Sequence, residues 1–197
     1  MPRPNLKDQR SREILDAFVT SAARFGLEGA TQERIAAEAG MKRTLLRHYL
    51  GNRDEMIAAL AEHVVSEFEA MLGMLREYAR QGNGIHDLVG VLFDPQYQTD
   101  TRLILVYQAL ISSVPDHPEM RTPLLTSMEN FTALIAGEAR KSFPGARKAD
   151  CESVALGLVA MYASCDTHAP LNPPAEWRDG VRRAAFKLID TLEEKKS

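Results

Sequence analysis

Apolar residues recur every three or four positions along most of this 197-residue chain, which is the spacing of amphipathic α-helices. No segment alternates between apolar and polar residues for long enough to indicate a β-sheet. Proline and glycine residues divide the helical pattern into segments. The predicted helices cover about residues 12–25, 31–39, 43–50, 53–80, 86–93, 101–114, 122–143, 148–164 and 174–194. The sequence therefore predicts an all-α fold of about nine helices.

The segment from Thr31 to Leu50 predicts two short helices joined by a tight turn, which is the form of a helix-turn-helix. The Thr31 hydroxyl can cap the first helix, and Glu33 places negative charge near its N-terminus. Gly40 can end that helix in a left-handed backbone conformation, since glycine has no Cβ. Helical spacing in the second helix predicts an inner face of Leu45, Leu46, Tyr49 and Leu50, an outer face of Arg43 and Arg47, and a neighbouring row of Thr44 and His48.

The charges of the second helix are unfavourable for an isolated helix. Lys42 and Arg43 lie at the positive end of the helix dipole, at a cost of about 0.3 to 1 kcal/mol each. Lys42 also occupies the position where a capping side chain is usual. Such a conflict is expected where a polyanion supplies the missing negative charge. From these residues alone, a nucleic-acid-binding helix and a solvated basic face on an ordinary bundle helix both remain open.

Charge is distributed unevenly along the chain. Residues 1–53 contain ten Lys and Arg against six Asp and Glu, a net charge of +4. Because the whole chain carries -3, the remaining residues carry -7. This asymmetry suggests a basic module that meets nucleic acid and an acidic module with another role.

Cysteine content and hydropathy predict a cytoplasmic protein. If one helix holds both Cys151 and Cys165, they lie about 21 Å apart along its axis, too far for a disulfide. The N-terminus lacks an apolar signal core. The longest uncharged runs, 103–114 and 153–165, are shorter than the about 20 residues that span a bilayer. We therefore expect reduced thiols and no membrane segment.

A long periodic segment links the two modules. It begins with a capping-box pattern at Asn52 and Glu55 and continues to about Arg80, and the charge sign changes along it. The last two helices carry broad apolar stripes, and in the first of them the small residues Gly157, Ala160 and Ala163 lie between the larger ones. A four-helix dimer interface and an intramolecular core both explain these stripes. We favour a homodimer through the last two helices, because palindromic DNA requires two-fold symmetry.

The first sixty or so residues resemble the TetR family of one-component bacterial transcriptional regulators. The resemblance is carried by Ile14-Leu15, Phe25-Gly26, Ala30-Thr31, Ile35-Ala36, Glu38-Ala39-Gly40, Leu46, His48-Tyr49-Leu50 and Asn52-Arg53-Asp54-Glu55-Met56. It implies a helix-turn-helix DNA-binding domain of three helices over residues 1–55. Residues 56–197 would then form a helical domain for regulation, ligand binding and dimerisation.

By this resemblance, the second helix of the motif enters the major groove of double-stranded DNA at a palindromic operator. Arg43 and Thr44 are expected to contact base edges, because an arginine can form two hydrogen bonds to guanine. Contacts to the DNA backbone are expected from Lys42, Arg47, His48, Tyr49, Arg53 and, in the N-terminal arm, Lys7 and Arg10. Lys42, Thr44 and Arg47 replace a serine cap, a small residue and an aromatic residue of the family pattern, so the family's operator contacts are not transferred.

The resemblance also implies that an unidentified small molecule binds the acidic body and releases the DNA. Candidate ligand residues are polar, aromatic or sulfur-containing and lie on helices that wall the cavity in relatives: Arg102, Tyr107, Gln108, Met128, Phe131, Tyr162, Cys165 and His168. Each is also compatible with an ordinary core or surface role. Cys165 and His168 alone are too few ligands for a metal site, and we expect neither a metal nor a cofactor.

Motifs of common enzyme classes are absent from the sequence. It has no HExxH, phosphate loop, GxSxG or GxGxxG, and no histidine follows a glutamate by three residues. We therefore predict a DNA-binding transcriptional regulator and no enzyme, in the form of a dimeric repressor that a small-molecule ligand releases from its operator. A helical protein-protein interaction module without DNA binding is the alternative.

Overall fold

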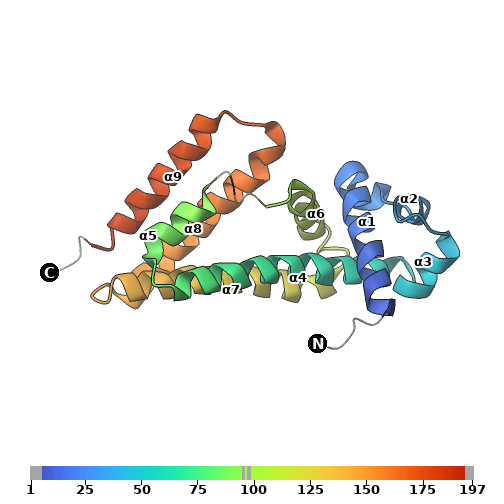
Figure 1. Cartoon of the computed structure of the whole chain (residues 1–197), viewed down its shortest axis with the longest axis horizontal. Helices are drawn as coiled ribbons and strands as arrows, with labels where there is room; N and C mark the ends of the chain where they lie inside the picture. Colours follow the sequence, from blue (N-terminus) through green and yellow to red (C-terminus); the bar gives the residue numbers. More distant parts are fainter. Residues whose placement is uncertain (1–5, 95, 97–98, 194–197) are drawn as a thin grey trace. The chain divides into compact units, whose positions relative to one another are not determined.

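The chain folds into helices joined by short loops (Figure 1). The computed structural model describes residues 6–94, 96 and 99–193, and within them it contains no β-strand, which confirms the all-α prediction. The 3-10 helices η2 (Pro118–Met120) and η3 (Ala169–Leu171) lie between α-helices of the described chain. The α-helices are α1 (Leu6–Gly29), α2 (Gln32–Glu38), α3 (Arg43–Leu50), α4 (Arg53–Arg80), α5 (Gly84–Leu92), α6 (Thr101–Ser112), α7 (Arg121–Ser142), α8 (Lys148–His168) and α9 (Ala175–Asp190).

Contacts divide the chain into two compact units that are not sequential halves. One unit combines residues 1–67 with 102–125, and the other combines 68–101 with 126–197. Helices α4 and α7 each contribute residues to both units. A boundary at residues 55 and 56 for the DNA-binding function stays a prediction.

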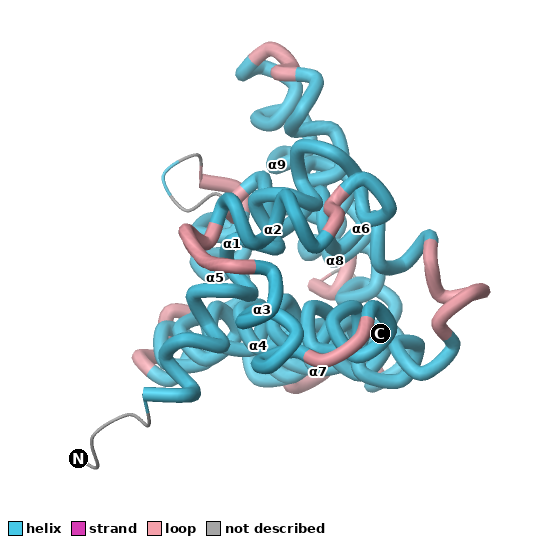
Figure 2. The backbone as a smooth tube through the Cα atoms, turned by 90° about the vertical axis from the view of Figure 1, so that its right-hand side faces the viewer, coloured by secondary structure: helices cyan, strands magenta, loops and turns pink. Residues whose placement is uncertain are grey.

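The first unit contains the helix-turn-helix. Helix α1 packs against both α2 and α3, and α2 and α3 are joined by a short loop (Figure 2). Its apolar centre includes Ile14, Phe18, Ile35, Leu46 and Met56, each of which is fully buried. Burial of a side chain of this size contributes about 1.5–3 kcal/mol before the cost of chain ordering. These residues therefore fix α2 and α3 against α1.

Local sequence signals set the ends of α2 and the start of α3. The Arg34 backbone N–H donates to the Thr31 hydroxyl over 3.3 Å, which confirms Thr31 as the cap. Gly40 adopts a φ of 63°, the left-handed conformation predicted for it. Lys42 precedes α3 without a side-chain cap. The Thr31 cap, the left-handed Gly40 and the uncapped start of α3 therefore all agree with the prediction from the sequence.

The start of α4 is a complete capping box. The Glu55 N–H donates to Asn52 Oδ1 over 3.0 Å, and the Asn52 N–H donates to Glu55 Oε2 over 2.7 Å. Gly51 has a φ of 77°, and a Cβ there would lie 2.0 Å from Glu55 Oε2. Glycine at this position thus allows the chain to leave α3 and the capping box to close.

The second unit has its core where α5, α8 and α9 pack together. Part of the apolar stripe of α8 belongs to this core: Val154, Ala155 and Leu158 are buried in it. A Cβ on Gly157 would lie 2.7 Å from Leu188 Cδ2, so this glycine permits the close approach of α8 and α9. The apolar stripes of α8 and α9 therefore form, in part, an intramolecular core, which is one of the two explanations that the sequence left open.

Candidate nucleic-acid interface

Helix α3 presents a polar, cationic surface. Leu46 and Leu50 anchor it in the core with 0% and 8% exposure. Tyr49 is half-buried, and its ring meets the His48 ring edge-on with centroids 5.5 Å apart. The predicted DNA-binding residues that the structure exposes together on α3 or at its start are Lys42, Arg43, Thr44, Arg47 and His48. The predicted recognition surface is thus accessible.

Arg43 has partners on α2. Its Nη1 lies 2.5 Å from Glu33 Oε1, and its Nε donates to Gln32 Oε1 over 3.1 Å. The two side chains of the ion pair are each 62% exposed, so solvent weakens their attraction. The positive charge that disfavours the start of α3 is therefore partly offset by a carboxylate on the neighbouring helix.

Arg53 is held by the end of α1. Its guanidinium donates to the carbonyl oxygens of Ala30, over 2.8 Å, and Leu27, and it stacks over the Phe18 ring at 5.4 Å. These bonds satisfy carbonyl groups that a helix end leaves without partners. The residue thus joins α4 to the end of α1, and its predicted contact with the DNA backbone stays a prediction.

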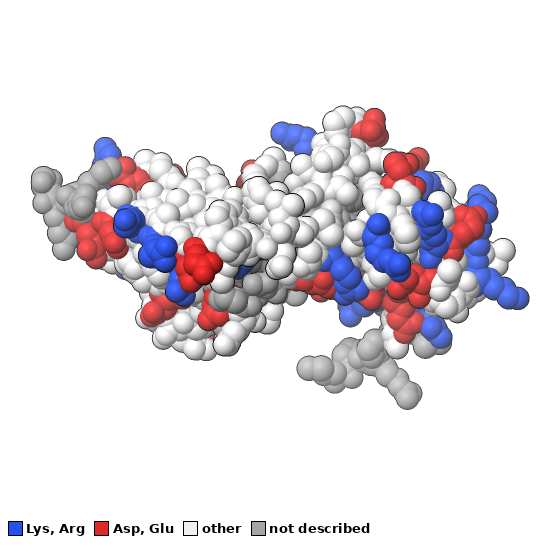
Figure 3. All heavy atoms as spheres, turned by 90° about the horizontal axis from the view of Figure 1, so that it is seen from above, with Lys and Arg blue, Asp and Glu red and all other residues white. Residues whose placement is uncertain are grey.

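The N-terminal arm is only partly described. The Lys7 side chain lies outside the described residues, whereas Arg10 is exposed on α1 and pairs with Glu13 at 2.6 Å. Lys and Arg lie among Asp and Glu over α1 and α2 in Figure 3, at the right of the view. The cations of this unit are therefore interspersed with carboxylates on this face.

Leu45 does not lie on the buried face that the helical spacing predicted for it. The apolar spacing predicted an inward side chain, but Leu45 is 46% exposed on α3. A helix of eight residues has room for a narrow buried face, and Leu46 and Leu50 already fill it. No signal in the spacing distinguishes Leu45 from these two residues.

Three of the predicted ligand residues come together in the second unit. Phe131, Tyr162 and Cys165 belong to one apolar cluster, and the Phe131 and Tyr162 rings meet edge-on with centroids 5.7 Å apart. Burial raises the pKa of the Cys165 thiol, which disfavours the reactive thiolate. We call Phe131 on α7 and Tyr162 on α8 the aromatic wall, and Cys165 lies in the same cluster.

A buried acid that the sequence pattern did not predict lies beside this wall. Asp166 is 9% exposed and forms side-chain hydrogen bonds with Tyr162 and Thr99. The Tyr162 hydroxyl and the Thr99 hydroxyl are 2.9 Å apart. Burial raises the pKa of Asp166 to about 6, against the nearby Arg178 and these hydrogen bonds, which lower it. The available signal was the spacing of Tyr162 and Asp166, four residues apart on one helix face.

The other predicted ligand residues have separate surroundings. Arg102, Tyr107 and Gln108 belong to the first unit, where the Arg102 guanidinium donates to the Thr20 hydroxyl over 2.8 Å. The Gln108 amide nitrogen is buried and lacks a hydrogen-bond partner among the described residues. Met128 is 47% exposed, and His168 is exposed beside Trp177. The structure therefore does not join all eight residues in one cluster.

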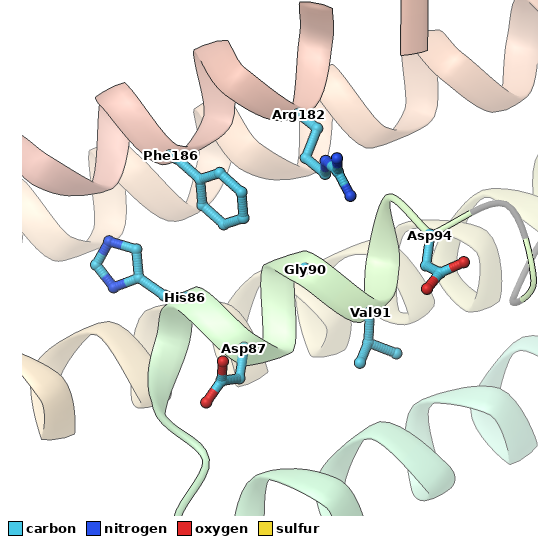
Figure 4. Close-up of a pocket in the computed structure, with 7 residues that line it drawn as sticks. All are labelled: His86, Asp87, Gly90, Val91, Asp94, Arg182 and Phe186. Atoms are coloured by element: carbon cyan, nitrogen blue, oxygen red, sulfur yellow. The ribbon is translucent and has the colours of Figure 1, made fainter. Parts of the chain in front are cut away.

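A shallow groove of about 430 Å³ lies between α5 and α9 (Figure 4). It is lined by His86, Asp87, Gly90, Val91, Asp94, Arg182 and Phe186, none of which was a predicted ligand residue. His86 stacks on Phe186 and lies 3.1 Å from Asp190. Within the described residues, the groove included, no group of three or more His, Cys, Asp and Glu side chains is placed to hold a metal ion. The described helices are likewise all too short or too polar to cross a membrane.

Comparison with known proteins places this helix-turn-helix in a known fold. No family model matches the sequence. The helix-turn-helix transcriptional regulator BetI of Paraburkholderia phytofirmans is 23% identical over 163 residues, which cover 82% of each chain. A TetR-family transcriptional regulator from Cytophaga hutchinsonii superposes with a TM-score of 0.77 at 13% identity, over 99% of this chain and all of the other. The chain has the TetR-family fold.

Sequence relatives and fold neighbours agree on the class of protein. Both groups include DNA-binding transcriptional regulators of the TetR type, which are not enzymes. The alternative of an interaction module without DNA binding finds no support among them. Another neighbour is the multidrug binding protein EbrR, whose structure contains imidazole and superposes with a TM-score of 0.63 at 17% identity, over 91% of this chain and 94% of that one.

Proposed function

We propose that the protein is a dimeric TetR-type repressor that binds a palindromic operator and releases it when a small molecule binds. The observation that carries this proposal is the exposed face of α3, a well-anchored helix with Lys42 immediately before its start and Arg47 and His48 in its last turn. Such a helix places its first residues on base edges in the major groove. As a regulator of bacterial DNA, the protein would work in the cytoplasm.

The proposed contacts follow from the surroundings of each cation. Arg47 is exposed on α3 and can form charge-assisted bonds with phosphate oxygens. Arg43 can contact guanine once DNA competes with Glu33, because the ion pair is exposed and weak. Phosphate contacts would supply most of the affinity and set the position of the helix, whereas base contacts would supply sequence preference.

The proposed dimer uses the apolar residues that the intramolecular core leaves uncovered. Leu156 is 58% exposed on α8, and Ala160 and Ala163 are exposed on the same side. On α9, Trp177 and Ala184 are exposed. Small residues between larger ones allow close helix crossing, and two copies of α8 and α9 would make a four-helix interface.

The proposed ligand site lies in the second unit, beside the aromatic wall of Phe131 and Tyr162. The nearby buried carboxyl of Asp166 and hydroxyl of Thr99 offer polar groups among apolar side chains, the usual composition of small-molecule sites. The complex of EbrR with imidazole supports a small-molecule site in this fold. A ligand would release DNA only if it binds better to one arrangement of the two DNA-binding units of the dimer.

Selection of bound sequences from random DNA, followed by fluorescence anisotropy at several salt concentrations, tests the DNA-binding proposal. If about four phosphate contacts form per subunit, the logarithm of affinity should fall against the logarithm of salt with a slope near -7. Arg47→Ala should reduce the magnitude of this slope by about 2 for the dimer. Arg80→Ala, which removes an exposed arginine of the second unit, should leave the slope unchanged. Salt-independent binding, or selection without a shared palindrome, would contradict the proposal.

A thermal-shift screen of small molecules tests the ligand site. A ligand of the second unit should raise the unfolding temperature and lower the affinity for the selected operator. Phe131→Ala should weaken both effects of that ligand together. Stabilising ligands that all leave DNA affinity unchanged would contradict release by a small molecule.

A further inference from the structure

Leu45 is an exposed leucine of the first unit that takes no part in the buried core. The side chain is 46% exposed, while Leu46 and Leu50 anchor α3 with 0% and 8% exposure. Single exposed leucines are common on protein surfaces and alone indicate nothing. This leucine, however, stands between the polar and cationic residues of the proposed recognition helix.

The position of Leu45 on α3 turns it away from the core. Successive residues of an α-helix are about 100° apart, so Leu45 lies about 120° from the centre of the face that Leu46 and Leu50 bury. Thr44 and His48 lie farther still from that centre on the outer face, and His48 is about 60° from Leu45 around the helix. Leu45 is also the third residue of α3, and the first residues of a recognition helix are those that approach base edges.

Leu45 does not belong to a larger apolar patch that would suit a protein partner. Phe25, another exposed apolar residue of this unit, is 44% exposed, and two guanidiniums contact its ring: Arg24 at 5.1 Å and Arg34 at 4.3 Å from the ring centroid. The neighbours of Leu45 one helical turn away are His48, which is polar and exposed, and Tyr49, which is half-buried. A protein interface requires a larger apolar centre than one leucine provides.

One apolar group is available to Leu45 in the major groove of DNA. The C5-methyl group of thymine projects there, whereas the other base edges present hydrogen-bond donors and acceptors. We propose that Leu45 contacts the 5-methyl group of a thymine in each half-site and is thereby a specificity-determining residue. This inference rests on the proposed function, because it requires that α3 enter the major groove.

Replacement of thymine by deoxyuridine tests this contact, because it removes the methyl group and keeps every hydrogen-bonding group. A set of operator duplexes is prepared, each with deoxyuridine in place of thymine at a single position, and the replacement is made in both half-sites. The affinity of the full-length protein for each duplex is measured by anisotropy. At the contacted position, affinity should fall about fourfold per half-site, or about fifteenfold for the dimer, as for one buried methyl group. Thymines elsewhere in the operator serve as the DNA controls.

Variants at position 45 test whether Leu45 is the residue that senses the thymine methyl group. The methyl effect is the difference in affinity between the thymine and deoxyuridine duplexes. Leu45→Ala should bind the thymine operator more weakly and should show equal affinity for the thymine and deoxyuridine duplexes at the contacted position. Leu45→Met, which retains an apolar side chain, should preserve most of the difference. Leu171→Ala, which removes a leucine that is 76% exposed in the second unit, should behave as the wild type.

The outcomes separate this contact from the proposed function. Sequence-specific binding with no methyl effect at any thymine, or with an effect that persists in Leu45→Ala, would overturn the contact alone. Absence of any sequence-specific DNA binding would overturn the proposed function and this contact with it. Circular dichroism of the Leu45→Ala variant should match the wild type, because the side chain is not part of the core.

Discussion

The buried carboxyl of Asp166 should make the stability of the protein depend on pH. Removal from water disfavours the charged form, and burial raises the pKa of Asp166 from 3.8 to about 6. Arg178 and the hydrogen bonds from Tyr162 and Thr99 oppose this rise without cancelling it. The folded protein therefore keeps a proton on this carboxyl at pH values where the unfolded chain has lost it.

The sign and size of the effect follow from this difference. A carboxyl with a raised pKa in the folded state contributes stability that is present below about pH 4 and is lost as the pH rises through about 6. A shift of about two units corresponds to about 3 kcal/mol, of which about 2 kcal/mol is lost between pH 4.5 and 7.5. Asp166→Asn removes the titration and should therefore gain about 2 kcal/mol relative to the wild type over this interval.

Urea unfolding of the wild type and Asp166→Asn at pH 4.5 and 7.5 measures this gain. The difference in free energy of unfolding between the two proteins should change with pH in favour of the variant. Asp87→Asn, at an exposed carboxyl of the same unit, controls for the loss of one negative charge. A difference between Asp166→Asn and the wild type that is equal at both pH values would refute the reasoning.

Three further substitutions test other parts of the structure. Glu33→Gln frees Arg43 from an exposed ion pair and should raise operator affinity by up to about fivefold in anisotropy, with little gain in an Arg43→Ala background; a loss of affinity would contradict the competition. Gly51→Ala combines a strained positive φ with a clash against Glu55, and it should therefore lower the free energy of unfolding by at least about 1 kcal/mol. An unchanged free energy of unfolding in urea titrations would be evidence against this turn. Ala160→Glu places a charge on the exposed side of α8 and should shift the protein from dimer to monomer in sedimentation experiments; a dimer as tight as the wild type would exclude this face.

Local signals in the sequence predicted the helix-turn-helix because short-range interactions determine it. The Thr31 cap, the left-handed Gly40 and the Asn52–Glu55 capping box each involve residues no more than three positions apart. The helical period likewise arises within each segment, and so the end of α4 at Arg80 also agreed with the prediction. Here a residue's neighbours along the chain are also its neighbours in space.

The tertiary structure decided which side chains of these helices are exposed and which are held by distant residues. Glu33 reaches Arg43 from the preceding helix, and Arg53 binds the end of α1 from more than twenty positions along the chain. Spacing also assigned Leu45 to the core, whereas the packing of α3 against α1 and α2 leaves room for a narrower face. Asp166 is buried because α8 packs among distant segments, and that burial raises its pKa. The sequence by itself thus determined the helices and the motif, since these depend on local bonds, but the exposure and charge state of individual side chains depend on contacts that form only when distant segments pack together.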